Sequence, residues 1–143
     1  MNWRRRFEPI VGAFVLVALI ALPLFAQGRR GKGMPNYDPK TEITIQGTVE
    51  EVTQLAGVRG WKGTHLAFKS DAETFDVHLG PSEFLVDQGM RFEKGDRIEV
   101  TGSKVKYGES DALIAREVKK ADQMLVLRNA QGIPKWSRSR WRW

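Results

Sequence analysis

THLAFKSDAETFDVHLGP, residues 64–81, contains two runs of alternating apolar and polar residues on either side of a short polar centre. Alternation in two runs joined by a turn predicts a β-hairpin. With the turn centred on Asp71-Ala72, Ser70 pairs with Glu73, and the chain's only two histidines, His65 and His78, lie directly opposite each other. One register therefore accounts for the whole stretch.

The predicted hairpin has one apolar and one polar face, because successive side chains of a strand point to opposite sides. The face expected to join the core contains Leu66, Phe68, Phe75, Val77 and Leu79. The polar face contains His65, Lys69, Thr74, Asp76 and His78. The hairpin thus predicts both a part of the core and a candidate site.

Three residues of the polar face have side chains that ligate metal ions. His65 and His78 would present two imidazoles across the strand pair, and Asp76 lies two residues from His78 on the same face. This donor set suits Cu(II), Zn(II) or Ni(II), although a closed structural zinc site uses four protein ligands. Two alternatives stay open: the histidines are solvated residues on the outer face, or their close pairing makes them respond to pH near neutrality.

Another strand is predicted before the hairpin. The run from Ile43 to Val49 alternates with its apolar residues inward. The shift to inward-facing Val52 and Leu55 predicts a β-bulge near Glu50-Glu51, which would bend a long first strand.

The segments after the hairpin complete a recognisable order. Ser82–Gln88 predicts a short helix with Ser82 as its N-cap, and Arg97–Tyr107 and Ala112–Val118 predict two more strands. Three strands, a short helix and two strands are the order of the OB-fold. The predicted fold is therefore all-β: a five-stranded OB-fold barrel with a short helix between strands three and four, and a further C-terminal hairpin over residues 123–136.

The 143-residue chain is predicted to carry one folded domain, residues 41–122, between extensions. Residues 1–26 combine three arginines with an apolar run and predict a secretory signal peptide or a retained N-terminal membrane anchor. Residues 27–40 predict a flexible basic linker, and residues 137–143 form a basic Trp/Arg tail. Either interpretation of the N-terminus predicts an exported protein of the periplasm or cell envelope.

Composition narrows the classes of function. The net charge is +6, but residues 33–137 contain 14 Lys and Arg against 16 Asp and Glu, a net charge of −2. That stretch has no cationic excess for the positive stripe of a nucleic-acid-binding surface. With no cysteine, disulfides, thiolate chemistry, iron–sulfur clusters and covalent c-type haem are excluded. No nucleophile, base and orienting group form a recognisable set, which predicts that the protein is not an enzyme.

Aromatic and cationic residues outside the histidine cluster form two further candidate sets. The set predicted to bind a ligand on the hairpin face and adjoining loops is Arg59, Trp61, Lys62, Lys69 and Tyr107. These side chains would stack a base, a sugar or a peptide; alternatively, Trp61 packs on the barrel rim. The set predicted to contact an anionic membrane surface or a polyanion is Trp136, Arg138, Arg140, Trp141, Arg142 and Trp143. A disordered tail without function is the alternative.

Several segments carry a family resemblance, among them YDPKTEITIQGTVEEV (37–52), VHLGPSEFL (77–85) and KGDRIEVTGSKV (94–105). They resemble exported bacterial OB-fold proteins often labelled DNA-binding, are similar to the OB-like domain of the magnetosome MamS/MamX family, and are more distantly similar to the YgiW/YdeI periplasmic stress-tolerance family. The resemblance implies an OB-fold envelope protein acting in metal or mineral handling. MamX proteins attach haem through CxxCH, which this cysteine-free chain lacks.

The residues and the resemblance together predict a non-enzymatic cell-envelope OB-fold module. It would recognise a small ligand, a metal ion or a protein partner on the face of the predicted hairpin. The alternatives are a nucleic-acid-binding OB-fold protein and a metal-handling accessory of a redox or magnetosome-like system.

Overall fold

The computed structural model describes residues 35–57 and 60–138. The predicted signal peptide or anchor, most of the predicted linker and the end of the basic tail lie outside these residues. Within the described ranges, no helix is both long and apolar enough to cross a membrane.

Strands make up most of the described chain. They are β1 (Glu42–Ala56), β2 (Lys62–Lys69), β3 (Thr74–Pro81), β4 (Arg97–Tyr107), β5 (Ser110–Lys120) and β6 (Gln123–Val126). The helix α1 (Ser82–Asp87) lies between β3 and β4, and the 3-10 turns η1 (Pro39–Thr41) and η3 (Lys135–Arg138) lie before β1 and after β6.

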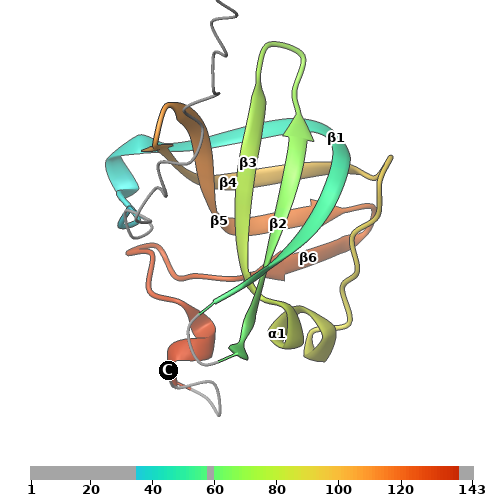
Figure 1. The fold of residues 1–143 in the computed structure, drawn as a ribbon, viewed down its shortest axis with the longest axis vertical. Helices are drawn as coiled ribbons and strands as arrows, with labels where there is room; N and C mark the ends of the chain where they lie inside the picture. The colour runs from blue at the N-terminus through green and yellow to red at the C-terminus, as the bar shows by residue number, and fades with distance from the viewer. Residues whose placement is uncertain (1–34, 58–59, 139–143) are drawn as a thin grey trace, which may run out of the picture. The chain divides into compact units, whose positions relative to one another are not determined.

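The strands form one sheet that closes on itself. Their order is β3-β2-β1-β4-β5-β6, and an additional pairing joins β3 to β5 (Figure 1). This last pairing is parallel, whereas the neighbouring pairs in the sheet are antiparallel. β1 to β5 therefore make a closed barrel with β6 added beside β5, which confirms the predicted OB-fold with its helix between strands three and four.

The predicted register of the hairpin is confirmed. His65 pairs with His78, Leu66 with Val77 and Phe68 with Phe75. The bulge in β1 is also confirmed, because the β1–β2 register shifts between Val49 and Glu51. It lets one curved strand pair first with β4 and then with β2.

The barrel interior holds the core, and the predicted inner face of the hairpin forms much of it. Its fully buried side chains include Val49, Leu66, Phe68, Val77, Leu79, Val100, Leu113 and Val118. Leu55, predicted to face inward, is instead 49% exposed. After the bulge, Val52 packs against the core, and Leu55, three residues further on, points to the opposite face.

The predicted cap of α1 was wrong, whereas the predicted C-terminal hairpin is present in a shorter form. Ser82 does not cap α1, because Pro81 occupies the N-cap and the Ser82 hydroxyl bonds Thr64 Oγ1 at 2.8 Å. The predicted C-terminal hairpin over residues 123–136 is confirmed in its coarse form. β6 pairs with β5, and the chain then reverses so that Arg128 and Pro134 form an antiparallel bridge, with backbone hydrogen bonds from Asn129 to Ile133 and from Lys135 to Leu127.

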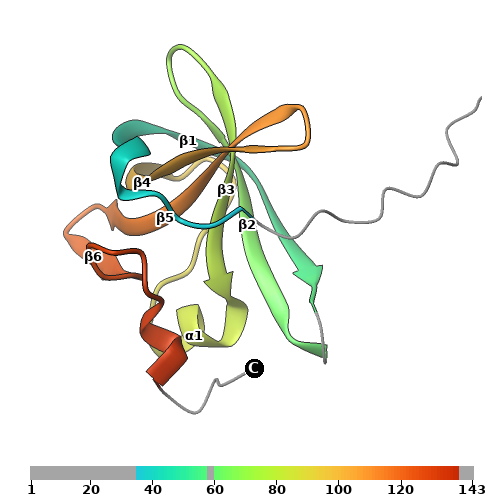
Figure 2. The ribbon, with the colours of Figure 1, turned by 90° about the vertical axis from the view of Figure 1, so that its left-hand side faces the viewer.

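The helix and the C-terminal segment lie at the end of the barrel opposite the β2–β3 turn (Figure 2). Trp136 is only 5% exposed, and its ring lies 5.4 Å from that of Phe84 in α1. Gly80, with φ of 145°, leaves room for this ring, because a Cβ there would lie 2.6 Å from it. The Arg128 guanidinium stacks 4.8 Å from the same ring. Trp136 therefore belongs to the core, and its prediction as a tail contact was wrong.

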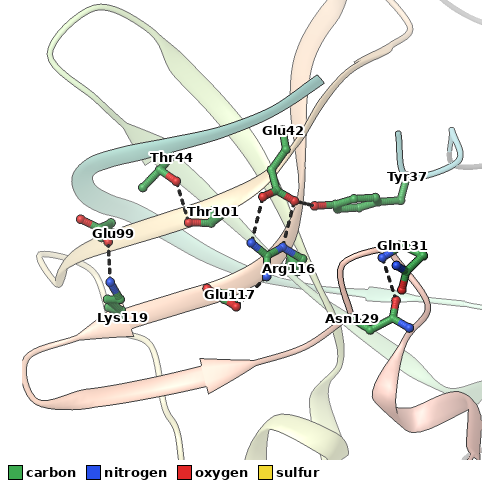
Figure 3. Close-up of polar contacts among 10 residues, drawn as sticks. All are labelled: Tyr37, Glu42, Thr44, Glu99, Thr101, Arg116, Glu117, Lys119, Asn129 and Gln131. Carbon is green, nitrogen blue, oxygen red and sulfur yellow. Dashed lines mark hydrogen bonds and ion pairs between the residues drawn. The ribbon is translucent and has the colours of Figure 1, made fainter. Parts of the chain in front are cut away.

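A polar cluster fastens the segment before β1 to the outside of the barrel (Figure 3). Arg116 on β5 donates two hydrogen bonds to Glu42, at 2.9 and 2.8 Å, and the Tyr37 hydroxyl donates to the same carboxylate. Partial burial, this hydrogen bond and the nearby negative charge raise the pKa of Tyr37 to about 12. Hydrogen bonding by Arg116 lowers the pKa of Glu42.

Leu66→Ala tests the importance of the hairpin's inner face. Because Leu66 is fully buried in the core, the change should lower the free energy of unfolding by about 2–5 kcal/mol. Urea unfolding of the full chain measures this loss. Val86→Ala is the control, since Val86 is 60% exposed and the change should stay within about 0.5 kcal/mol. Equal losses in the two variants would contradict the assigned core.

A second prediction concerns Tyr37, one of two tyrosines in the chain. In the Tyr107→Phe variant, the remaining phenol should ionise near pH 12 rather than near its ordinary value of about 10. The raised folded-state pKa means that its contribution to stability is complete below about pH 10 and is lost as the pH rises toward 12. Ultraviolet absorbance of tyrosinate, followed with circular dichroism, measures both. Adding Glu42→Gln should lower the midpoint; an unchanged midpoint would contradict the proposed cause.

Candidate metal-binding site

The candidate ligands lie on the outer side of two adjacent strands. His65 is on β2, and Asp76 and His78 are on β3. The register places His65 opposite His78, while Asp76 lies one side-chain repeat away on the same face. The period-2 pattern of the hairpin thus brings together three residues that belong to two strands.

The three side chains are close enough to hold one ion. Asp76 Oδ1 lies 3.4 Å from His65 Nδ1, and Asp76 Oδ2 lies 3.1 Å from His78 Nε2. One ligand atom from each residue lies within 4.8 Å of the others. Metal bonds of about 2 Å put neighbouring ligand atoms roughly 3–4 Å apart, so small side-chain adjustments suffice for a shared ion.

His78 is buried, which overturns the alternative that both histidines are solvated. It is 3% exposed, and within the described chain neither ring nitrogen has a hydrogen-bond partner. Its Nε2 approaches Asp76 without the alignment of a hydrogen bond. The cause of the burial is barrel closure: β3 pairs on its other side with β5, where His78 meets the buried Ile114, and the Tyr107 ring lies 5.7 Å away.

An unsatisfied buried imidazole carries a cost. Leaving a buried polar atom without a partner costs about 1–3 kcal/mol, and such atoms are rare in folded proteins. An ion bound to Nε2 would give one of the two nitrogens a partner, and the neighbouring Asp76 carboxylate would bind the same ion. The residues present therefore fit a metal ion.

Asp76 is in the state that metal binding requires. Burial disfavours its ionised form, but the hydrogen bond from His65 and the approach of His78 outweigh this cost. Together they hold the pKa of Asp76 well below its usual range. The carboxylate is therefore ionised near neutral pH and available as an oxygen ligand.

A surface cavity of about 410 Å³ opens beside the cluster. His65 and Asp76 line it, together with Thr53 and Leu55 of β1 and Ala67 of β2. Ala67 pairs with Asp76 in the hairpin, so only a methyl group lies next to the carboxylate on this strand. The cluster thus connects a buried histidine to an accessible space.

The predicted ligand-binding set is divided by the fold. Tyr107 comes close to the cluster through its edge-on contact with His78. Lys62 lines a different cavity, with Gln54, Ser82 and Val86 among its other lining residues. Lys69 is exposed at the end of β2, where it pairs with Thr74. Arg59 lies outside the described residues.

Trp61 packs against its own loop. Its ring occupies the space where a Cβ on Gly57 or Gly63 would lie, and its carbonyl accepts a hydrogen bond from Gly57 at 2.8 Å. This placement matches the alternative of packing on the rim. Of the predicted tail contacts, Arg140, Trp141, Arg142 and Trp143 lie outside the described residues, as does the side chain of Arg138.

Sequence reasoning missed the residues that surround the cluster. Thr53 is the β1 partner of His65, and Asp111 lines the same cavity from β5. Thr53 could have been found by extending the hairpin register across the bulge in β1. Asp111 gave no local signal, because β5 meets β3 only when the barrel closes.

Comparisons with known proteins place this architecture in a family. No curated protein matches the sequence. A structural comparison finds similarity to Rim1, a mitochondrial single-stranded DNA binding protein from S. cerevisiae, with 13% identity, a TM-score of 0.38, and coverage of 64% of this chain and 98% of that chain. Residues 41–125, more than half of the chain, match the family model of the MamS/MamX magnetosome proteins. The chain therefore belongs to the MamS/MamX magnetosome protein family.

Proposed function

We propose that this protein is a non-enzymatic OB-fold module of the cell envelope that binds a divalent metal ion through His65, Asp76 and His78. One observation carries the proposal: His78 is buried beside an ionised carboxylate, 3.1 Å from its Nε2, and neither ring nitrogen makes an aligned hydrogen bond within the described residues. A structural histidine normally has a hydrogen-bond partner when it is buried. A metal ion supplies what the protein itself does not.

The donor set selects a class of ion. Two imidazoles and one carboxylate suit Cu(II), Zn(II) and Ni(II), whereas Ca²⁺ and Mg²⁺ prefer sites built from oxygen ligands. His78 would be the buried ligand, and His65 and Asp76 would hold the ion on the side of the cavity. A bound ion would supply a fixed positive centre at the barrel surface.

The wider context supports a metal-handling role in the envelope. The arginines and apolar run in residues 1–26 are typical of export, and the family is described as one of magnetosome proteins. Without cysteine the chain cannot attach haem covalently as MamX proteins do, and its two histidines supply the imidazole nitrogens that suit Zn(II), Cu(II) and Ni(II).

The nucleic-acid alternative has less support from the barrel. Five basic side chains on β4 and β5 are paired with carboxylates. These pairs are Lys104–Glu73, Lys106–Asp111, Arg116–Glu42, Lys119–Glu99 and Lys120–Asp96. Phosphate contacts would have to compete with these carboxylates.

Metal titration tests the proposal. The full-length chain without a histidine tag should bind one Cu(II), Zn(II) or Ni(II) per molecule in isothermal titration calorimetry. His65→Ala and Asp76→Asn should each weaken binding at least roughly tenfold, because each removes a ligand. Asp71→Asn, on the exposed turn of the same hairpin, is the matched control and should bind as the wild type does.

Identical isotherms for the wild type and His65→Ala would overturn the metal site. A single-stranded oligonucleotide, added at low salt with a chelator present, forms the second arm of the experiment. Binding in that arm that weakens steeply with salt would support the nucleic-acid alternative instead.

The cost of the unpartnered histidine gives an independent prediction. Without metal, His78→Leu should leave the free energy of unfolding unchanged or raise it by up to about 3 kcal/mol, because a buried unsatisfied group is replaced by an apolar one. With metal in excess, only the wild type should gain stability. Urea unfolding with chelator and with Zn(II) measures both. A large loss of stability in the metal-free variant would contradict the view that His78 makes no stabilising hydrogen bond.

A further inference from the structure

We propose that the ion held by His65, Asp76 and His78 takes its remaining ligand from solution, and that this ligand is a small anion entering through the cavity beside Ala67. The inference rests on the proposed metal site and names the class of molecule that the site would recognise.

The protein supplies ligands from one side only. All three donors project from the outer face of the β2–β3 pair. Among the residues that the structure describes, no fourth histidine, cysteine, aspartate or glutamate belongs to this group, whose ligand atoms lie within 4.8 Å of one another. Zinc takes at least four ligands, and a site with three protein ligands keeps a position open for another molecule. The open position therefore faces away from the sheet.

The cavity is at that open position. Its volume of about 410 Å³ is many times the roughly 30 Å³ that one water molecule occupies in the liquid. It is lined by two of the proposed ligands, His65 and Asp76, whereas His78 is buried. Ala67 pairs with Asp76 and Thr53 pairs with His65, so small side chains border the cluster. A larger residue at position 67 would fill the space that an incoming ligand needs.

Charge decides the class of ligand. A divalent ion with two neutral imidazoles and one carboxylate keeps one net positive charge. The other acid of the cavity, Asp111, is already paired with Lys106 at 2.5 Å and lies 3.9 Å from Lys104. The lining also offers the hydroxyls of Thr53, Thr74 and Ser110, each of which can donate a hydrogen bond. A positive centre with hydroxyl donors favours a small anion over a neutral or cationic ligand.

Azide binding to the copper-loaded full-length chain tests this inference. The wild type should develop an azide-to-copper charge-transfer band that saturates as azide is added. Ala67→Leu should retain copper but lose at least roughly tenfold in apparent azide affinity, because the added side chain fills the cavity. Ala56→Leu is the matched control: Ala56 is exposed at the end of β1 and does not line the cavity, so its azide titration should match the wild type.

The outcomes separate this inference from the metal site itself. Failure of the wild type to bind copper overturns both. Copper binding with no azide band, or an azide affinity equal in the wild type and Ala67→Leu, overturns the open position and leaves the metal site standing. Where Ala67→Leu fails to fold or to bind copper, Thr53→Leu replaces it and is judged by the same comparison.

Discussion

The barrel closes because β3 pairs with β5 in parallel, and both the core and the candidate site follow from this pairing. It joins strands that are separated in sequence by α1 and β4, and it converts an open sheet into a barrel. Closure buries Val77 and Leu113 together in the interior. It also buries residues on the outer side of the same strands, because His78 and Ile114 then lie next to each other across the joint. The core and the candidate site thus share one structural cause.

Closure gives the two histidines different environments although they are paired. His65 keeps 15% of its side chain exposed at the edge of a cavity, and His78 keeps 4%. The two rings are in contact, with centroids 4.0 Å apart, and Asp76, which approaches both, remains 42% exposed. Exposure therefore rises from the buried His78 through His65 to the Asp76 carboxylate. Such a cluster is costly as a purely structural feature and is suited to holding an ion.

The ends of the domain are tied to the barrel by separate means. The segment before β1 is held by polar contacts, with Tyr37 and Arg116 both donating to Glu42. The segment after β6 is held by packing, with Trp136 against Phe84 and Arg128. Arg128 also donates to the carbonyls of Leu79 and Ala115. Burial lowers its pKa to about 10; this is still well above neutral pH, so the guanidinium stays charged.

Local sequence patterns were enough to predict the main elements and the register of the hairpin, because alternation and a short turn depend on neighbouring residues. The same local pattern predicted that His65, Asp76 and His78 share a face, and it predicted the bulge in β1. Local patterns did not predict that His78 is buried, that Trp136 is part of the core, or that Leu55 and Asp111 border the same cavity. These features follow from contacts between segments distant in sequence, which local periodicity does not predict. Burial by barrel closure is what leaves the ring nitrogens of His78 without hydrogen bonds within the described residues.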